Sequence, residues 1–451
     1  MNKSEAEDIV FDNCPELFRL YSQQKNILLS EYILEKKARE KKDTDKELIE
    51  TVKEIATDYI NSEAGRQAER ALQDNFSAST ADHHGIVSHP FSFHTFLVQK
   101  AIEEKPVIAF SCASISLDNS SFPKGLFWHA KNGIIEKFSF FQYKKRHMSV
   151  FSAPAIKKEY LFKKATTSEK RKIFSILDSV WEERESYKAQ SSYLTYVLSK
   201  KILSEKSPLI LIDQESIVLA LIKKHHLKKE TLIKNLLTNK KWQDSFQKYF
   251  FGKRGAFSED KGTFLFWYIN PKTKVRERFF YDNGFIKTKN GVRVQLSEEK
   301  LGTALEDGIL MPSMALSFIV LTFYYELDTP GGFLQIGYLG ELKNAWIEVL
   351  AENTHIDTKE LSLLETNKMK GDFGVFWGQF GNKNKLITLA DLLLAENISY
   401  ESWIKNVAQK ITVKDALDAM MGEYLKILAG KNIDTYEHKT ETFSFLPGVR
   451  E

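Results

Sequence analysis

Four of the ten histidines in this chain lie within twelve residues, and an aspartate comes directly before the first of them. The five side chains are Asp82, His83, His84, His89 and His94. Neutral imidazole is the commonest metal ligand in proteins, and a nearby carboxylate either joins the ligands or orients one of them. The cluster therefore predicts a divalent-metal site, for zinc or manganese, with Asp82, His84 and His94 as ligands.

The two remaining histidines of the cluster, His83 and His89, are predicted to perform acid–base chemistry. Imidazole has an unperturbed pKa of roughly 6.5, so it exchanges protons near neutral pH. The segment also has the residues of a loop, because Gly85 permits a positive φ and Pro90 disfavours helical backbone at His89. A loop of this kind can bring side chains from its two ends to one point.

A catalytic metal needs only three protein ligands, because the open position holds a water whose lowered pKa makes it a nucleophile. We therefore predict a metal-dependent hydrolase that acts on a small-molecule substrate. Any further ligand has to come from outside the cluster, and the nearest candidates are His129, His147 and Asp118. A packed core histidine is an equally good interpretation of His129.

The order of motifs between residues 82 and 125 resembles that of creatininase-like metal amidohydrolases. The matching motifs are Asp82-His83-His84-Gly85, His89-Pro90-Phe91, His94, a helix, the strand 107–110 and Phe122-Pro123-Lys124-Gly125. The resemblance implies hydrolysis of a C–N bond, with Asp82, His84 and His94 at the metal-ligand positions. Asp82 stands where that family has glutamate, and His94 stands where it has aspartate.

Two other functions fit the same residues. In the first, the chain is a non-catalytic interaction or scaffold protein, and the histidine cluster is structural. In the second, it is a metal-free acid–base enzyme for an anionic small molecule, with His83 or His89 near Lys145 and Arg146. Metal content separates the metal hydrolase from both alternatives. The sequence predicts no particular oligomeric state.

The elements that position these residues predict an α/β or α+β fold, with a mixed sheet core and extensive helical regions at both ends. The hydrophobic periodicity divides the chain into five segments. They are a helical arm (1–75), an α/β segment with the histidines (76–155), a mainly helical segment with one strand (156–260), a β-meander (261–300) and a mainly helical region (301–451).

Apolar runs predict buried strands at residues 106–112 and 208–213, and the second run ends at Asp213, which we interpret as a helix N-cap. Turn residues divide 263–296 into four strands, either a meander or part of a larger sheet. The uncharged stretch 308–325 predicts a buried core helix, too polar to span a membrane. A Pro-Gly-Gly turn at 330–332 follows it.

Composition describes a folded globular chain, since 43% of its 451 residues are hydrophobic. The net charge is only +4, from 64 basic and 60 acidic residues, and it gives no overall field for a polyanion. We therefore expect neither nucleic acid nor membrane as a partner. Two cysteines, no Cys-x-x-Cys motif and no secretory signal favour a cytoplasmic protein.

Overall fold

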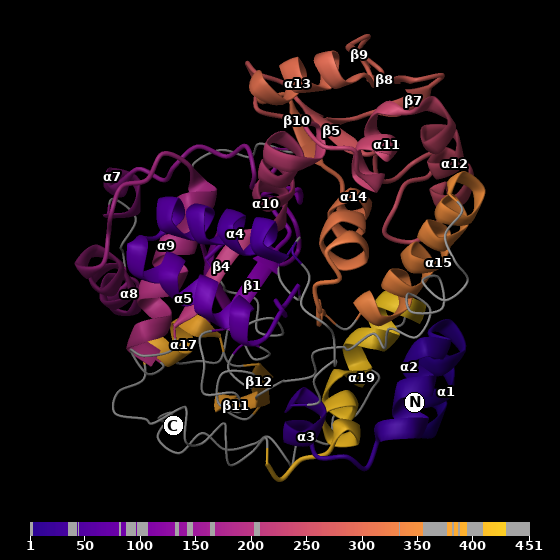
Figure 1. Cartoon of the computed structure of the whole chain (residues 1–451). Coiled ribbons are helices and arrows are strands. Elements are labelled where there is room, and N and C mark those ends of the chain that lie inside the picture. Colours follow the sequence, from indigo (N-terminus) through magenta and orange to yellow (C-terminus); the bar gives the residue numbers. More distant parts are fainter. Residues whose placement is uncertain are drawn as a thin grey trace.

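The computed structural model is an α/β protein, as the sequence predicts, with many helices packed around several small sheets (Figure 1). The structure describes residues 3–34, 43, 45–80, 83–86, 96, 107–130, 135–141, 148–162, 167–202, 208–332, 334–354, 377–380, 383–386, 388–394 and 409–429.

A parallel pair of strands lies at the centre of the fold. β1 (Val107–Ser111) pairs with β4 (Leu209–Asp213), and Ser111 lies opposite Asp213 at their carboxyl ends. Both strands are buried along their whole length, and strands covered on both faces read as continuous apolar runs. Both sequence predictions are confirmed.

The pleat of this pair separates two hydrophobic cores. Val107 and Ala109 of β1 pack into one core, whereas Ile108 and Phe110 pack into the other. β4 alternates in the same way, because successive side chains of a strand point to opposite faces. The two short strands therefore join both halves of the molecule.

Residues 77–80 lie beside β1 on the side away from β4, where Ser79 forms a parallel bridge to Ala109, and His83 forms a further parallel bridge to Cys112. The other edge of residues 77–80 is paired with a segment that lies much later in the chain. The Thr80 amide donates to the Pro330 carbonyl, 250 positions away, at 2.7 Å. Residues 77–80, which precede the histidines, are thus held between β1 and the segment around Pro330.

The N-terminal region is helical, as predicted. Its helices are α1 (Lys3–Asn13), α2 (Pro15–Gln24), α3 (Leu29–Leu34), α4 (Asp45–Tyr59) and α5 (Ser62–Asp74). Asn61 caps α5 by accepting a hydrogen bond from the Ala64 amide at 2.9 Å, which closes the α4–α5 hairpin. This hairpin packs beside β1 and β4, while α1 and α2 pack against the distant α19 (Val413–Ala429) (Figure 1).

Helices and hairpins complete the layers around the central strands, and α9 packs directly against β4. The helices are α7 (Lys158–Phe162), α8 (Ser168–Ser179), α9 (Tyr187–Ile202), α10 (Gln214–Leu221), α11 (Leu232–Thr238), α12 (Lys240–Phe250), α13 (Glu298–Glu306), α15 (Gln335–Asn353) and α17 (Leu389–Leu394). The hairpins are β2 (Gly125–His129) with β3 (Ile135–Ser139), and β11 (Trp377–Phe380) with β12 (Lys383–Leu386).

The predicted four-stranded meander is instead divided between two three-stranded sheets, in the orders β10–β5–β6 and β7–β8–β9. The strands are β5 (Phe266–Ile269), β6 (Arg276–Arg278), β7 (Phe280–Asp282), β8 (Phe285–Lys287), β9 (Arg293–Gln295) and β10 (Leu310–Pro312). The division falls at the buried Phe279, whose amide donates to the Thr263 hydroxyl at 2.8 Å instead of to a neighbouring strand.

The uncharged stretch 308–325 also differs from the single helix predicted for it. It forms β10, then α14 (Met314–Phe318) and then a π-helical turn, η2 (Ile319–Tyr324). A second π-helical turn, η1 (Ile222–His226), brings the ring of His226 to 4.9 Å from the Tyr324 ring. Among the described residues, no helix is both long and apolar enough to cross a membrane.

Candidate acid–base site

Polar side chains gather where β1 and β4 end. Ser111 and Asp213 are the last residues of the two strands, and both are fully buried. In open α/β folds, ligands bind at the carboxyl ends of parallel strands. We call the group formed by Tyr59, Lys188, Asp213, Glu215 and Ser216 the acid–base cluster.

The carboxylate of Asp213 is the centre of this cluster. It caps α10 by accepting a hydrogen bond from the Ser216 amide at 2.8 Å, as predicted for this residue. Its other oxygen accepts a hydrogen bond from the Tyr59 hydroxyl at 3.0 Å. Burial raises the pKa of Asp213, but the Lys188 ammonium and the bonds from Ser216 outweigh it, so the pKa lies below its usual range.

A chain of hydrogen bonds runs from the molecular surface to this buried carboxylate. Lys188 on α9 is half-buried, and its Nζ donates to the Ser216 hydroxyl at 2.6 Å. The Ser216 hydroxyl lies 2.8 Å from the hydroxyl of Tyr59. Because Tyr59 donates its proton to Asp213, Ser216 donates to Tyr59, and all three bonds point towards the carboxylate.

The second carboxylate of the cluster is Glu215, whose pKa is shifted in the opposite direction from that of Asp213. Its two oxygens accept hydrogen bonds from the consecutive amides of Ala113 and Ser114, each at 2.8 Å. The Cys112 thiol also donates to it, at 3.5 Å. Burial first, and then the neighbouring Asp213 charge, raise the pKa of Glu215 despite these donors.

One cation reaches the site from the other half of the molecule. Arg276 on β6 is half-buried and donates through Nη1 to the Ser114 carbonyl. Its guanidinium lies over the Trp267 ring, 4.3 Å from the centroid, and interacts electrostatically with Glu215. The loop after β1 is therefore held between Glu215 and Arg276.

His84, a predicted metal ligand, is fully buried at the edge of this site. Its Nδ1 lies 2.6 Å from the Ser111 hydroxyl, and its Nε2 lies 2.9 Å from the Lys188 carbonyl. A carbonyl only accepts, so Nε2 carries the proton and Nδ1 accepts from Ser111. Burial lowers the pKa of His84. A metal at His84 would have to displace one of these two partners.

The remaining residues of the predicted site are only partly described. His83 is exposed, and its Nδ1 lies 2.9 Å from the hydroxyl of Ser121. The other residues named in the predictions lie outside the described residues: Asp82, His89, His94, Lys145, Arg146 and His147. Within the described part of the chain, no three His, Cys, Asp or Glu side chains form a group that could hold a metal ion.

The two further ligand candidates have other partners. His129 is buried and forms an ion-pair contact with Asp391 at 2.8 Å between Nδ1 and Oδ2. The same carboxylate accepts the His129 amide and caps α17, so the pair joins β2 to that helix. Asp118 accepts a hydrogen bond from Lys124 near the surface.

Sequence reasoning did not identify Lys188, Glu215, Ser216 or Tyr59 as site residues. A signal existed for two of them, because Glu215 and Ser216 lie two and three positions after Asp213, the aspartate that ends an otherwise apolar strand. Lys188 and Tyr59 lie on helices of ordinary composition and carry no local signal. In comparisons with known proteins, the chain matches no protein-family model and no curated protein.

Proposed function

We propose that this protein is a metal-independent acid–base enzyme acting on an anionic small molecule, with Lys188 as the group that meets the substrate. One observation carries the proposal: the hydrogen-bond chain from half-buried Lys188 through Ser216 and Tyr59 to buried Asp213. Catalytic acids and bases are held in this way, by partners that fix both their position and their protonation.

Each bond of this hydrogen-bond chain points from the Lys188 ammonium towards Asp213, whose lowered pKa keeps the carboxylate ionised. The chain therefore fixes the position of Lys188 beside an ionised partner. Lys188 gives a proton from Nζ to the substrate as an acid, and the neutral amine that remains takes a proton back as a base.

The charges of the site favour an anionic substrate. Both carboxylates are fully buried and hydrogen-bonded, whereas the two cations, Lys188 and Arg276, are half-buried. An approaching molecule therefore meets positive charge before negative charge. Lys188 also lies over the Phe151 ring, 3.9 Å from the centroid, which leaves its ammonium few directions in which to donate hydrogen bonds.

The metal-dependent hydrolase remains a prediction, because three of its five named residues lie outside the described residues. The two functions differ in one measurable property, the need for a metal. Elemental analysis by plasma mass spectrometry, on wild type and on the H84A/H94A double variant, measures that property directly. Under our proposal the folded wild type contains no stoichiometric zinc or manganese.

The activity test uses chelator-treated protein and a library of small carboxylates and phosphate esters, with turnover followed by NMR. We expect turnover of at least one compound, and a loss of about 10²- to 10⁴-fold in Lys188→Met, as for removal of a general acid–base group. Lys223→Met, at an exposed lysine of η1, is the charge-matched control and keeps full activity.

Two results would overturn the proposal. Turnover only after zinc or manganese is restored, and lost in H84A/H94A, would establish the metal hydrolase. No turnover with or without metal, together with no effect of Lys188→Met on the binding of any library compound, would favour an interaction protein. Circular dichroism on each variant separates a lost activity from a lost fold.

A further inference from the structure

One face of the β7–β8–β9 sheet carries aromatic and basic side chains together. Directly paired residues of antiparallel strands lie on one face, and Phe280 pairs with Lys287, which in turn pairs with Arg293. Phe285 lies on this same face, while Ile286 lies on the opposite face and is fully buried. The face therefore points away from the core.

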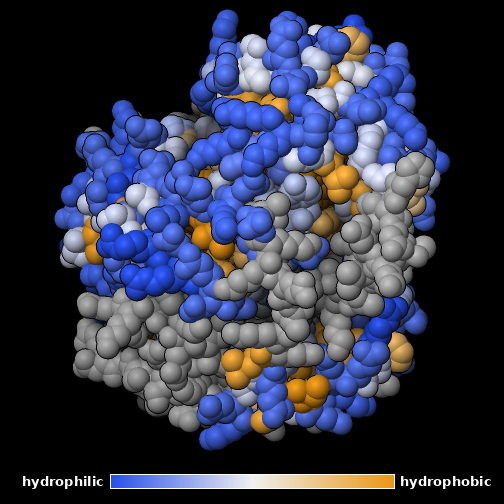
Figure 2. Space-filling view, viewed as in Figure 1, coloured by the Kyte–Doolittle hydropathy of each residue, from blue (hydrophilic) through white to orange (hydrophobic). Residues whose placement is uncertain are grey.

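Its side chains are accessible. Lys287 and Arg293 are exposed, and Phe280 and Phe285 are half-buried. We call these four residues, with the exposed Lys289 of the adjoining hairpin turn, the aromatic–basic face. Hydrophilic side chains dominate the visible surface at the end of the molecule where α13 and β7–β9 lie (Figure 2).

Each of the two rings has a cation above it. The Arg293 guanidinium lies 3.6 Å from the centroid of Phe285. Over Phe280, the Arg278 guanidinium lies at 4.9 Å and the Lys289 ammonium at 5.9 Å. Phe280 and Phe285 are diagonal neighbours on adjacent strands, a relationship that spaces side chains by about 7–8 Å. Two flat surfaces thus lie about one extended nucleotide apart.

The charge balance of the face is positive. Among the described residues, one acid shares this side of the sheet, Asp282, which pairs with Phe285 across the strands and forms an ion pair with Lys287 at 2.9 Å. Arg278 donates to the carbonyls of Ser258, Glu259, Lys261 and Gly262, so its guanidinium holds the adjoining loop through backbone oxygens. The exposed acids of that loop, Glu259 and Asp260, lie beside the face.

We propose that the aromatic–basic face binds single-stranded nucleic acid. Single strands are bound where bases stack on exposed aromatic rings and cations track the phosphates, and a sheet with outward aromatics is a common platform. Phe280 and Phe285 each take one base. Arg293 and Lys289 leave the rings that they now cover and move to the phosphates on either side.

No nucleic-acid partner is expected from the sequence, because the net charge of the chain is only +4. Binding at the aromatic–basic face does not require a large net charge. Net charge governs attraction at long range, whereas stacking and phosphate contacts act within the face itself. A duplex offers no free base to the two rings. The proposal therefore includes a clear preference for single strands over duplex.

The test measures fluorescence anisotropy of labelled dT20 and rU20 with the full chain at 50, 100 and 200 mM salt. We expect both strands to bind, and Phe285→Ala to weaken binding at least tenfold. Arg293→Gln should reduce the slope of log K against log salt by about 0.7, the value for one phosphate contact on a single strand. Binding of only one of the two strands would assign the face to that polymer.

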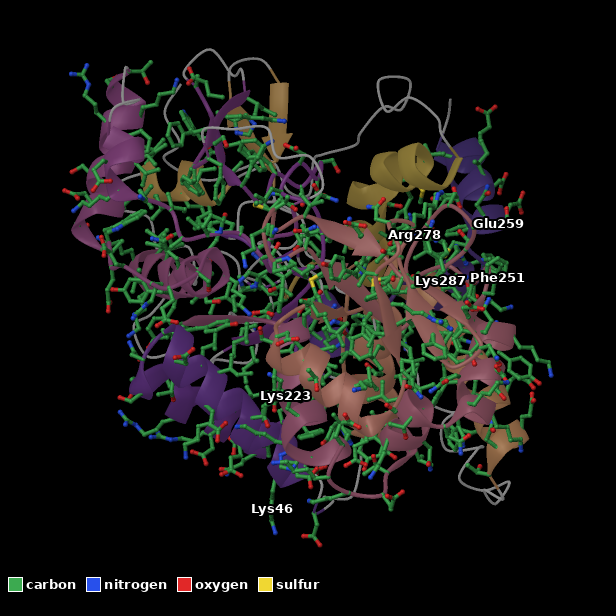
Figure 3. All side chains as sticks on the ribbon, turned by 90° about the horizontal axis from the view of Figure 1, so that it is seen from above. Lys46, Lys223, Phe251, Glu259, Arg278 and Lys287 are labelled. Atoms are coloured by element: carbon green, nitrogen blue, oxygen red, sulfur yellow. The ribbon has the colours of Figure 1, made fainter. Side chains whose placement is uncertain are left out.

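The control is the double variant Lys46→Gln/Lys223→Gln, which removes two exposed lysines far from this face (Figure 3). It is compared with Lys287→Gln/Arg293→Gln, which removes the same charge from the face. No binding at 50 mM salt overturns the proposal. So does equal weakening by the two double variants, equal affinity for a duplex of the same sequence, or unchanged affinity in folded Phe285→Ala.

Discussion

Asp213 and Glu215 are two positions apart at the end of β4, and the fold moves the pKa values of their carboxyl groups in opposite directions. Asp213 is held below its usual range by Lys188 and Ser216, whereas burial raises the pKa of Glu215. Paired carboxyl groups whose environments separate their pKa values are typical of acid–base sites.

The pKa of the Cys112 thiol, and therefore its reactivity, depends on the charge of Glu215. Burial and Glu215 together raise the pKa of Cys112, so little thiolate forms at pH 8. Glu215→Gln removes the neighbouring charge, and we expect alkylation of Cys112 by iodoacetamide to become about three- to tenfold faster. Mass spectrometry of the labelled peptide measures the rate. Cys14 in the same sample is the internal control, and an unchanged Cys112 rate would contradict the interaction.

Tyr59 links Ser216 to Asp213 through its hydroxyl alone. Tyr59→Phe keeps the ring but leaves one oxygen of a buried carboxylate without its donor. We expect the free energy of unfolding to fall by about 1–2 kcal/mol. Urea unfolding measures it, with Tyr196→Phe as control, because that buried tyrosine donates only to the Gln67 amide oxygen. If Tyr59→Phe were as stable as wild type, the hydrogen bond from Tyr59 to Asp213 would not contribute to the stability of the fold.

The Asp391 carboxylate serves as a helix cap and as the partner of His129. Thr388 and Asp391 form a capping pair at α17, and Thr412 and Asp415 form the same pair at α19 without a histidine. We expect Asp391→Ala to cost about 3–5 kcal/mol of stability, because the buried His129 loses the acceptor of its amide and its ring and α17 loses its cap. Asp415→Ala should cost only about 1–2 kcal/mol, as for a lost cap. Equal losses would show that His129 contributes nothing.

His226 gives the protein an acid-sensitive stability. Burial lowers its pKa from 6.5 to about 4, so the unfolded chain binds a proton between these values and the folded chain does not. The stability is therefore present above pH 6.5 and lost as the pH falls towards 4. The expected loss at pH 5 relative to pH 7.5 is about 2 kcal/mol in urea unfolding. His226→Gln should flatten this dependence, whereas His225→Gln should retain it.

The sequence predicts the central strands because burial on both faces requires uninterrupted apolar runs, and the runs ending at Ser111 and Asp213 are easily recognised. The division of the meander has no such signal. It depends on one tertiary hydrogen bond, from Phe279 to the Thr263 side chain. The alternation of side chains along residues 276–282 is the same whether they form one strand or are divided between β6 and β7, so the sequence pattern does not reveal the division.

The acid–base cluster could not be predicted from the sequence for a related reason. His84 meets Ser111 and Lys188, which lie 27 and 104 positions away, and neither distance has a local pattern. A histidine between two such partners has the same sequence appearance as a metal ligand. Only the acidic end of an apolar strand, at Asp213, was visible in advance, and its N-cap role is confirmed.

The pairing of residues 77–80 with the segment around Pro330 also governs how the chain can reach its fold. Thr80 and β1 are synthesised early, but Pro330, the partner of Thr80, is synthesised 250 residues after Thr80. Contacts of such long sequence separation slow folding and leave a strand edge open in the meantime. A fragment that stops before residue 327 would keep that edge open permanently. It should therefore aggregate, although it contains every residue of β1 and β4.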